Sequence, residues 1–360
     1  MNSSVSYLVS HEIPLGWDDF VKRSKHSVPF ILSSFLNYSK QRTVFIIALN
    51  SDNKMIGGLV SRIRGTRSLF GFNFKVFWLD AFPIIDRQSC EKEIEIQTEL
   101  LSLLKNEARK AGAIAITFSH WTRVRCDSLL KQADFEIKRY ATFILDLRED
   151  EDSIFSRFSK TTRKKIKRAS VNKAVCVKHL CGSEVYPFIE KFHAVHKKSY
   201  YKAVETSKNS AMSLRTASSI RDLVNSFGDN IFLSLAFQGE TIVSGNLVIR
   251  CGKSLFPFIA GTDTESKESA NSVSFLFWSF FLWAKRRGFE VYDMGGVPAN
   301  PEVNHPAYGV YRFKKSFGGE YQEFYGGTHV INRARFGLFM KISKNKRILR
   351  IAKKIFKGKI

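Results

Sequence analysis

Two stretches of the chain share one order of hydrophobic and polar positions. Residues 44–58 and 231–245 each contain an apolar run, a short polar turn and a second run that ends at a glycine. Short apolar runs with turn residues between them predict two strands joined as a hairpin. Gly65 and Gly252 are the same number of residues apart as Gly58 and Gly245, which end the two stretches. The two stretches therefore align beyond the hairpins.

A second match follows in the same order. Residues 108–116 and 284–292 each contain the end of a helix, a glycine and an apolar run. Glycine just past the last helical turn is a common helix ending, here at Gly112 and Gly288. Each half therefore predicts two strands, a helix and a further strand. This order resembles the acyltransferase fold called GNAT, repeated in tandem. The predicted class is α/β (α+β), with mixed sheets flanked by helices.

A chain of 360 residues favours two domains, and 44% hydrophobic residues suffice for two packed cores. The expected parts are two GNAT-like domains, a segment that returns to the first domain, and a basic amphipathic tail, over residues 1–145, 146–325, 326–345 and 346–360. The most apolar run, Val273–Ala284, has twelve residues, too few to span a bilayer, which needs about 20. We expect it to be a buried helix.

The net charge is the feature of the composition that says most about the partners of the protein. A formal net charge of +24 favours a polyanionic partner or an anionic membrane surface. Residues 157–178 contain nine Lys or Arg and no acid, and residues 333–360 contain eleven and no acid. The tail repeats apolar residues on one helical face, so it could bind an anionic bilayer, tRNA phosphates, or only keep the chain soluble.

No metal or cofactor is expected. The five cysteines have no zinc-finger spacing, and an odd number without a secretion signal indicates reduced thiols in a cytosol. His193 and His196 are three residues apart on a predicted helix, but the sequence offers no third ligand. We therefore expect a cytoplasmic protein, with peripheral contact at the inner face of the membrane through the tail.

Most candidate catalytic and binding residues lie in the segment 292–319. Tyr-Asp-Met-Gly-Gly at 292–296 predicts a strand that runs into a double-glycine turn. Residues 309–319 place an arginine and two lysines among aromatic side chains, between glycines. Cations beside aromatic rings suit a site that holds negative charge. The simpler alternative is a basic surface hairpin.

This segment resembles the signature of the Fem family (FemA, FemB and FemX). The resemblance extends to four further segments, 81–86, 159–169, 239–245 and 281–296, although Phe82 replaces a glycine of the family pattern. The helical-hairpin insertion of FemA and FemB is not visible, so the two-domain FemX type is the closer match. The resemblance implies transfer of an amino acid from aminoacyl-tRNA to a UDP- or lipid-linked muropeptide precursor of peptidoglycan.

The resemblance also implies site residues. Lys314 would stabilise the oxyanion of the reaction, and Phe313 would help to place it. Lys315 is the alternative, because adjacent residues of an extended segment face opposite ways. Further substrate contacts are expected from the rest of the two signature halves, at Tyr311, Arg312, Asp293, Gly295 and Gly296.

The pyrophosphate of such an acceptor requires Lys or Arg. Arg163 and Lys164, at the start of the basic helix, are the first candidates. Lys40 and Arg42 in the first domain are weaker ones. For each of these the simpler interpretation is a solvated surface charge.

Two other functions stay open. One keeps the fold and uses acyl-CoA as donor on a surface polysaccharide or sugar precursor. A glycine-rich loop for the coenzyme pyrophosphate is absent at the expected place, where polar and acidic residues stand at 261–272. The other is a non-catalytic protein that binds RNA or a membrane.

Overall fold

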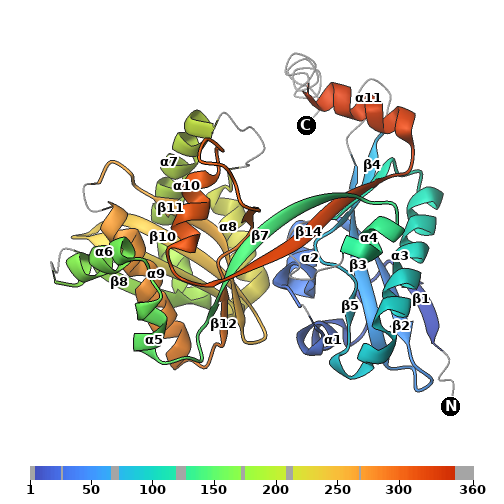
Figure 1. The fold of residues 1–360 in the computed structure, drawn as a ribbon, viewed down its shortest axis with the longest axis horizontal. Helices are drawn as coiled ribbons and strands as arrows, with labels where there is room; N and C mark the ends of the chain where they lie inside the picture. Colours follow the sequence, from blue (N-terminus) through green and yellow to red (C-terminus); the bar gives the residue numbers. More distant parts are fainter. Residues whose placement is uncertain are drawn as a thin grey trace. The chain divides into compact units, whose positions relative to one another are not determined.

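The computed structural model has two compact units, one of residues 1–139 with 324–360 and one of residues 140–323. The chain leaves the first unit within β7 (Glu136–Asp146) and returns to it within β14 (Glu320–Val330) (Figure 1). The structure describes residues 5–25, 27–65, 73–118, 127–171, 175–207, 214–266 and 269–344.

The first unit contains a mixed sheet in the order β1-β2-β3-β4-β6-β14. Neighbouring strands are antiparallel except β4 and β6, which are parallel, and the short β5 pairs with β3. The strands besides β14 are β1 (Ser6–Ser10), β2 (Arg42–Leu49), β3 (Met55–Gly65), β4 (Lys75–Leu79), β5 (Ile84–Ile85) and β6 (Ala115–Phe118). The helices are α1 (Trp17–Arg23), α2 (Ser33–Ser39), α3 (Glu93–Lys110), α4 (Asp127–Gln132) and α11 (Arg333–Lys344).

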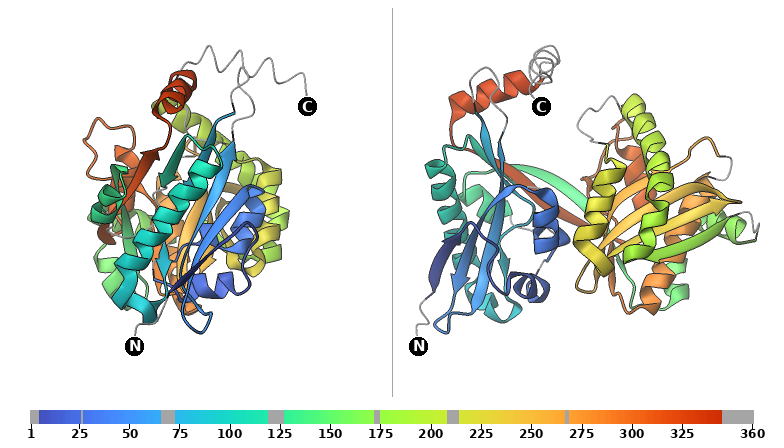
Figure 2. Two further views of the ribbon diagram at one scale, coloured as in Figure 1. Left: turned by 90° about the vertical axis from the view of Figure 1, so that its right-hand side faces the viewer. Right: turned by 180° about the vertical axis from the view of Figure 1, so that it is seen from behind.

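Helix α3 covers one face of this sheet (Figure 2). Its buried residues recur every three or four positions and pack on β2 and β3, which is the pattern of an amphipathic helix. Leu100 and Leu104 of α3 are fully buried against Ile46 and Phe77 of the strands in one apolar cluster.

The second unit contains a sheet in the order β7-β12-β11-β10-β9-β8. Only β11 and β12 are parallel neighbours, and the short β13 pairs with β7. The strands besides β7 are β8 (Cys176–Cys181), β9 (Ile231–Gln238), β10 (Thr241–Cys251), β11 (Ser254–Thr262), β12 (Val291–Asp293) and β13 (Val297–Pro298). The helices are α5 (Glu151–Ser156), α6 (Lys160–Val171), α7 (Ile189–Ser207), α8 (Ala217–Phe227), α9 (Ser269–Arg286) and α10 (Tyr308–Lys315).

Helix α9 is the predicted apolar helix, and it forms the centre of the second core. Phe277, Phe280 and Phe281 pack edge-on around the ring of Tyr292 on β12. The helix ends in Lys285 and Arg286, and Gly288 follows with φ of 78°. Because α9 covers β12, it holds the strand that leads into the double-glycine segment. Among the residues with described placement, no helix is long and apolar enough to cross a membrane.

Both predicted hairpins are present, and their glycines have equivalent roles. A Cβ atom at Gly58 would lie 3.0 Å from Trp17 of α1. A Cβ atom at Gly245 would lie 2.6 Å from Phe192 of α7. In each unit, therefore, a helix ahead of the hairpin packs an aromatic ring directly on the strand backbone. This equivalence supports the internal repeat seen in the sequence.

Candidate functional site

Residues 308–315 form helix α10, so our expectation of an extended segment was wrong. Two contacts explain the helix: Tyr311 packs edge-on against Phe143 of β7, and Phe313 packs edge-on against Phe277 of α9. Adjacent residues of a helix point about 100° apart rather than to opposite faces. Lys314 is accordingly partly buried and Lys315 exposed on neighbouring sides of one helix.

The ammonium group of Lys314 contacts the double-glycine segment, Gly295 and Gly296. Its Nζ donates to the carbonyl oxygen of Gly295 at 2.9 Å and to that of Gly296 at 3.2 Å. Loss of hydration lowers the pKa of Lys314 to about 8, against the opposing attraction of the Asp293 carboxylate. An ammonium group carries three N–H donors, so one remains for a further acceptor.

Asp293 and Thr142 fix the position of the double-glycine segment through hydrogen bonds. The buried carboxylate of Asp293 accepts from the backbone N–H of Gly295 at 2.8 Å and from Thr142 Oγ1 at 2.5 Å. Thr142 Oγ1 also lies 3.2 Å from the carbonyl oxygen of Gly295. Thr142 comes from β7 and Asp293 from β12, which are antiparallel neighbours. Paired strands therefore fix the two carbonyl oxygens that Lys314 contacts.

The position of Gly295 requires a residue without a side chain. Its φ is +80°, a region that residues with a Cβ atom rarely adopt. A Cβ atom there would also lie 3.3 Å from Lys314 Nζ. The glycine thus allows both the turn and the close approach of the lysine.

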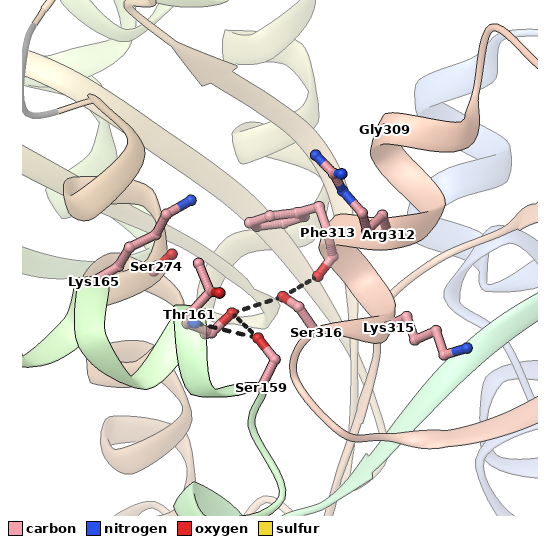
Figure 3. A pocket seen from close by; sticks show the side chains of 10 residues that line it. Ser159, Thr161, Lys165, Ser274, Gly309, Arg312, Phe313, Lys315 and Ser316 are labelled. Carbon is pink, nitrogen blue, oxygen red and sulfur yellow. Dashed lines mark hydrogen bonds between the residues drawn. The ribbon is translucent and has the colours of Figure 1, made fainter. Parts of the chain in front are cut away.

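The C-terminal end of α10 is tied to the start of α6 (Figure 3). The backbone N–H of Ser159 donates to the carbonyl oxygen of Ser316 at 2.8 Å. Thr162 Oγ1 donates to Ser316 Oγ at 2.9 Å, and Ser316 Oγ donates to the carbonyl oxygen of Phe313 at 2.7 Å. These bonds set the distance between the two helices.

A pocket of about 580 Å³ opens between α6, α9 and α10. Its walls carry hydroxyl groups, cationic side chains and one aromatic ring. Figure 3 shows Lys165 extending from α6 and Arg312 from α10, with the ring of Phe313 between them, whereas Lys315 points away. The lining residues are Ser159, Thr161, Thr162, Lys165, Ser274, Gly309, Arg312, Phe313, Lys315 and Ser316.

The expected pyrophosphate contacts do not face this pocket. Arg163 donates from Nη1 to the carbonyl oxygen of Ser156 at 2.5 Å, which closes the α5–α6 connection. Lys164 is exposed and does not line the pocket. Lys40 is exposed in the other unit, where it ends α2 with φ of 51°. Lys165, which sequence reasoning missed, lies four residues after Thr161 and thus on the same helical face.

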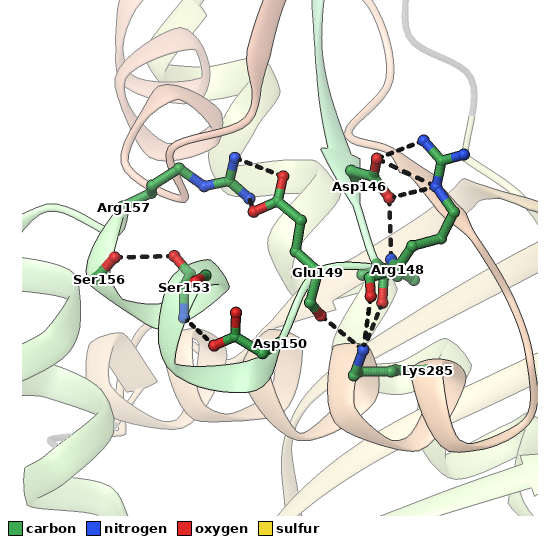
Figure 4. A network of polar contacts seen from close by, with 9 residues as sticks. Asp146, Arg148, Glu149, Asp150, Ser153, Ser156, Arg157 and Lys285 are labelled. Atoms are coloured by element: carbon green, nitrogen blue, oxygen red, sulfur yellow. Dashed lines mark hydrogen bonds and ion pairs between the residues drawn. The ribbon is translucent and has the colours of Figure 1, made fainter.

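The segment between β7 and α6 is anchored to α9 (Figure 4). Lys285 donates from Nζ to three consecutive carbonyl oxygens, of Leu147 at 3.1 Å, Arg148 at 3.2 Å and Glu149 at 2.6 Å. Glu149 in turn pairs with Arg157 at 2.6 Å. This network holds α5 on α9, and with it the start of α6 at the pocket.

The other candidates from the sequence are the histidine pair and the C-terminal tail, and neither forms a site among the described residues. Within the described ranges, no three His, Cys, Asp or Glu residues group as metal ligands. His196 Nδ1 lies 2.9 Å from the carbonyl oxygen of Ala260 on β11, and His193 lies on the same helix α7. The proposed membrane-binding tail, residues 346–360, lies outside the described residues.

Comparison with known proteins agrees with this fold. The sequence pattern of the FemAB family matches residues 234–340, which include β12, the double-glycine segment and α10. No curated protein sequence matches the chain.

Three solved structures with this architecture are similar over nearly the whole chain. The structure of FemX has a TM-score of 0.71 and 14% identity, and covers 92% of this chain and 99% of its own. That of L-PGS from Bacillus licheniformis has a TM-score of 0.57 and 12% identity, over 92% and 96%. A tandem GNAT protein from the clavulanic acid biosynthesis pathway has a TM-score of 0.54 and 11% identity, over 91% and 98%. The predicted tandem GNAT-like fold is confirmed.

Proposed function

We propose that this chain is an aminoacyltransferase, because the FemAB family pattern matches residues 234–340 and the fold is similar to that of FemX. Its donor is aminoacyl-tRNA, and its acceptor is an amine of a UDP- or lipid-linked peptidoglycan precursor. The observation that carries the proposal is the partly buried cation of Lys314, held by two carbonyl oxygens within the segment that matches the family.

The reaction needs fixed positive charge more than it needs a protein nucleophile. The acceptor amine attacks the carbonyl carbon of the ester, and a C–N bond forms. The carbonyl oxygen becomes an oxyanion, and then the C–O bond to the tRNA ribose breaks. The proton that the amine loses leaves with the ribose hydroxyl. A preorganised donor at the oxyanion contributes about 2.7–4 kcal/mol to lowering the barrier.

Lys314 supplies that donor. The carbonyl oxygens of Gly295 and Gly296 take two of its N–H groups and direct the third outward. Burial of the ammonium group removes competing water, which strengthens its interaction with a developing negative charge. Phe313 precedes Lys314 and packs on Phe277, so it fixes the position of the lysine backbone.

We assign binding of the acceptor pyrophosphate to Lys and Arg side chains that solvent can reach. Lys164 has an exposed ammonium group that a phosphate can reach, and we retain it as a proposed contact. Lys40, exposed in the first unit, is a separate alternative to it. Arg163 stays in this set through the guanidinium nitrogens that the bond to Ser156 does not use.

A second donor class has one supporting observation, the similarity to a tandem GNAT protein. Acyl-CoA would then replace aminoacyl-tRNA. The two are distinguished by supplying charged tRNA and acetyl-CoA separately, each with muropeptide precursors, and following the acceptor mass. A mass increase of one amino acid with charged tRNA alone supports the proposal. An acetyl increase with acetyl-CoA and none with charged tRNA contradicts it.

A further inference from the structure

Helix α6 presents a row of cations on the side that faces away from α9. At about 100° of rotation per residue, Lys160, Lys164, Lys167 and Arg168 lie within one sector of about 100°. All four are exposed, and Val171 continues the row with 81% of its surface exposed. We call these five residues the outer face of α6.

The opposite side of α6 attaches the helix to the second unit. Thr162, Ile166 and Ala169 are buried, and Ile166 belongs to the apolar cluster that contains Phe280 of α9. Lys165 lines the pocket described above, so it is not part of the outer face. Packing on α9 thus stabilises the helix and leaves its outer face to solvent or to a partner.

The charges of the outer face oppose formation of the helix that carries them. Lys164 lies four residues from both Lys160 and Arg168, and like charges at this spacing destabilise a helix. The first turn contains no acid, and Lys160 at its start is repelled by the positive end of the helix dipole. A partner with negative charge would offset both repulsions.

The protein does not supply that negative charge from its described part. There, no Asp or Glu forms an ion pair with a cation of the outer face. Glu149, which precedes α5, pairs with Arg157. Glu151 of α5 pairs with Arg286 of α9. A compensating negative charge at the outer face therefore has to come from a partner.

Two features favour a bilayer surface over a nucleic acid as this partner. The twelve residues of α6 give a straight row about 18 Å long, which a flat surface can contact along its whole length. The second feature is Val171, because an exposed apolar side chain gains nothing from a sugar–phosphate backbone. Beside lysines and arginines, such a side chain suits the boundary between lipid headgroups and acyl chains.

We propose that the outer face of α6 docks the protein on an anionic bilayer. Its four cations contact headgroup phosphates, and Val171 inserts at the boundary with the acyl chains. This interaction surface goes beyond the proposed reaction and does not depend on its donor.

Cosedimentation of the full protein with vesicles tests the proposal. The wild type should bind vesicles of phosphatidylcholine with about one third phosphatidylglycerol and should not bind phosphatidylcholine alone. The α6 variant combines Lys160→Gln and Lys167→Gln, and it keeps Lys164, a proposed acceptor contact. Each cation near an anionic surface contributes about fivefold to affinity, so this variant should bind the anionic vesicles about 25-fold more weakly.

The matched control combines Lys191→Gln and Lys197→Gln on α7. Both lysines are exposed, and neither pairs with an acid among the described residues. This α7 variant has the same net charge and the same tail as the α6 variant, so a difference between them reports the outer face. Thermal unfolding should leave the α6 variant as stable as the wild type or more so, because one like-charge repulsion is removed. Equal vesicle binding by the α6 and α7 variants would overturn the inference.

Val171→Ser distinguishes a bilayer from other polyanions. It should weaken binding to the anionic vesicles and leave the binding of uncharged tRNA unchanged. If instead the α6 variant binds vesicles as the wild type does and loses tRNA binding, the outer face is an RNA surface and the inference is overturned.

Transfer from charged tRNA to a soluble UDP-linked acceptor, measured without vesicles, tests the proposed function separately. If the wild type shows no transfer while the α6 variant loses vesicle binding, the proposed function fails and the docking surface stands. If transfer occurs and both variants bind vesicles equally, the docking surface fails and the proposed function stands.

Discussion

Lys314 Nζ lies 2.9 Å from the carbonyl oxygen of Gly295, which joins helix α10 to the end of strand β12. The contact places a poorly hydrated cation at the end of β12, a strand that is paired on both sides in the second sheet. A backbone carbonyl oxygen carries no full charge, so it positions the ammonium group without neutralising it. The cation is thus left to interact with a negative charge that forms during a reaction.

The first prediction concerns the pH dependence of the rate. The pKa of Lys314 is lowered to about 8 by burial, so the ammonium form decreases as the pH rises through 8. If the cation stabilises the oxyanion, the turnover number should fall above about pH 8. Lys314→Met should lack this decrease, because it has no group to titrate. Stopped-time assays between pH 6 and 10 measure both profiles. A wild-type rate that rises through pH 8, with no rise in the variant, would make Lys314 a general base.

The second prediction concerns the pH dependence of stability. In the unfolded chain the pKa of Lys314 returns to about 10.5, so between about pH 8 and 10.5 the unfolded state binds more protons. The free energy of unfolding of the wild type should therefore gain a favourable contribution as the pH rises through this window. Urea titrations of the wild type and Lys314→Met, compared at pH 7 and pH 10, measure it. An identical change in both proteins would show that the pKa of Lys314 is not lowered.

These properties were only partly predictable from the sequence. The hairpins and α9 followed from apolar runs and glycines, because those patterns are local. Helix α10 did not, because Tyr311 and Phe313 alternate as in a strand and become helical through contacts with Phe143 and Phe277. Lys165 was hidden in a run of basic residues, since only the packing of α6 on α9 decides which of them lines the pocket.

The third prediction concerns Thr142, which sequence reasoning also missed. Thr142→Val keeps the shape and removes the hydroxyl that donates to Asp293. A buried carboxylate without one donor should cost about 1–3 kcal/mol of unfolding free energy. The rate should fall as well, because the glycine carbonyl oxygens lose their support. Thr142→Ser retains the hydroxyl and should restore most of the rate. Equal rates for the valine and serine variants would exclude a positioning role of the hydroxyl.

The fourth prediction concerns Gly295. Gly295→Ala places a Cβ atom 3.3 Å from Lys314 Nζ at a φ of +80°. The backbone strain should cost about 1–2 kcal/mol of stability, and the displaced ammonium group should slow the reaction. Gly252→Ala is the matched control, since it also has positive φ, 59°, but its Cβ atom would meet nothing within 4 Å. The control should lose stability alone. A comparable loss of rate in both variants would point to general strain.

The single-turnover rate of Lys314→Met tests the central claim most directly. With charged tRNA and a muropeptide acceptor at saturating concentrations, the variant lacks the ammonium group and its hydrogen bonds to Gly295 and Gly296. Loss of about 3 kcal/mol of transition-state stabilisation predicts a rate roughly 100-fold lower. The affinity for uncharged tRNA should change much less, because the oxyanion exists only during the reaction. A variant that transfers the aminoacyl group at the wild-type rate would contradict the catalytic role of Lys314.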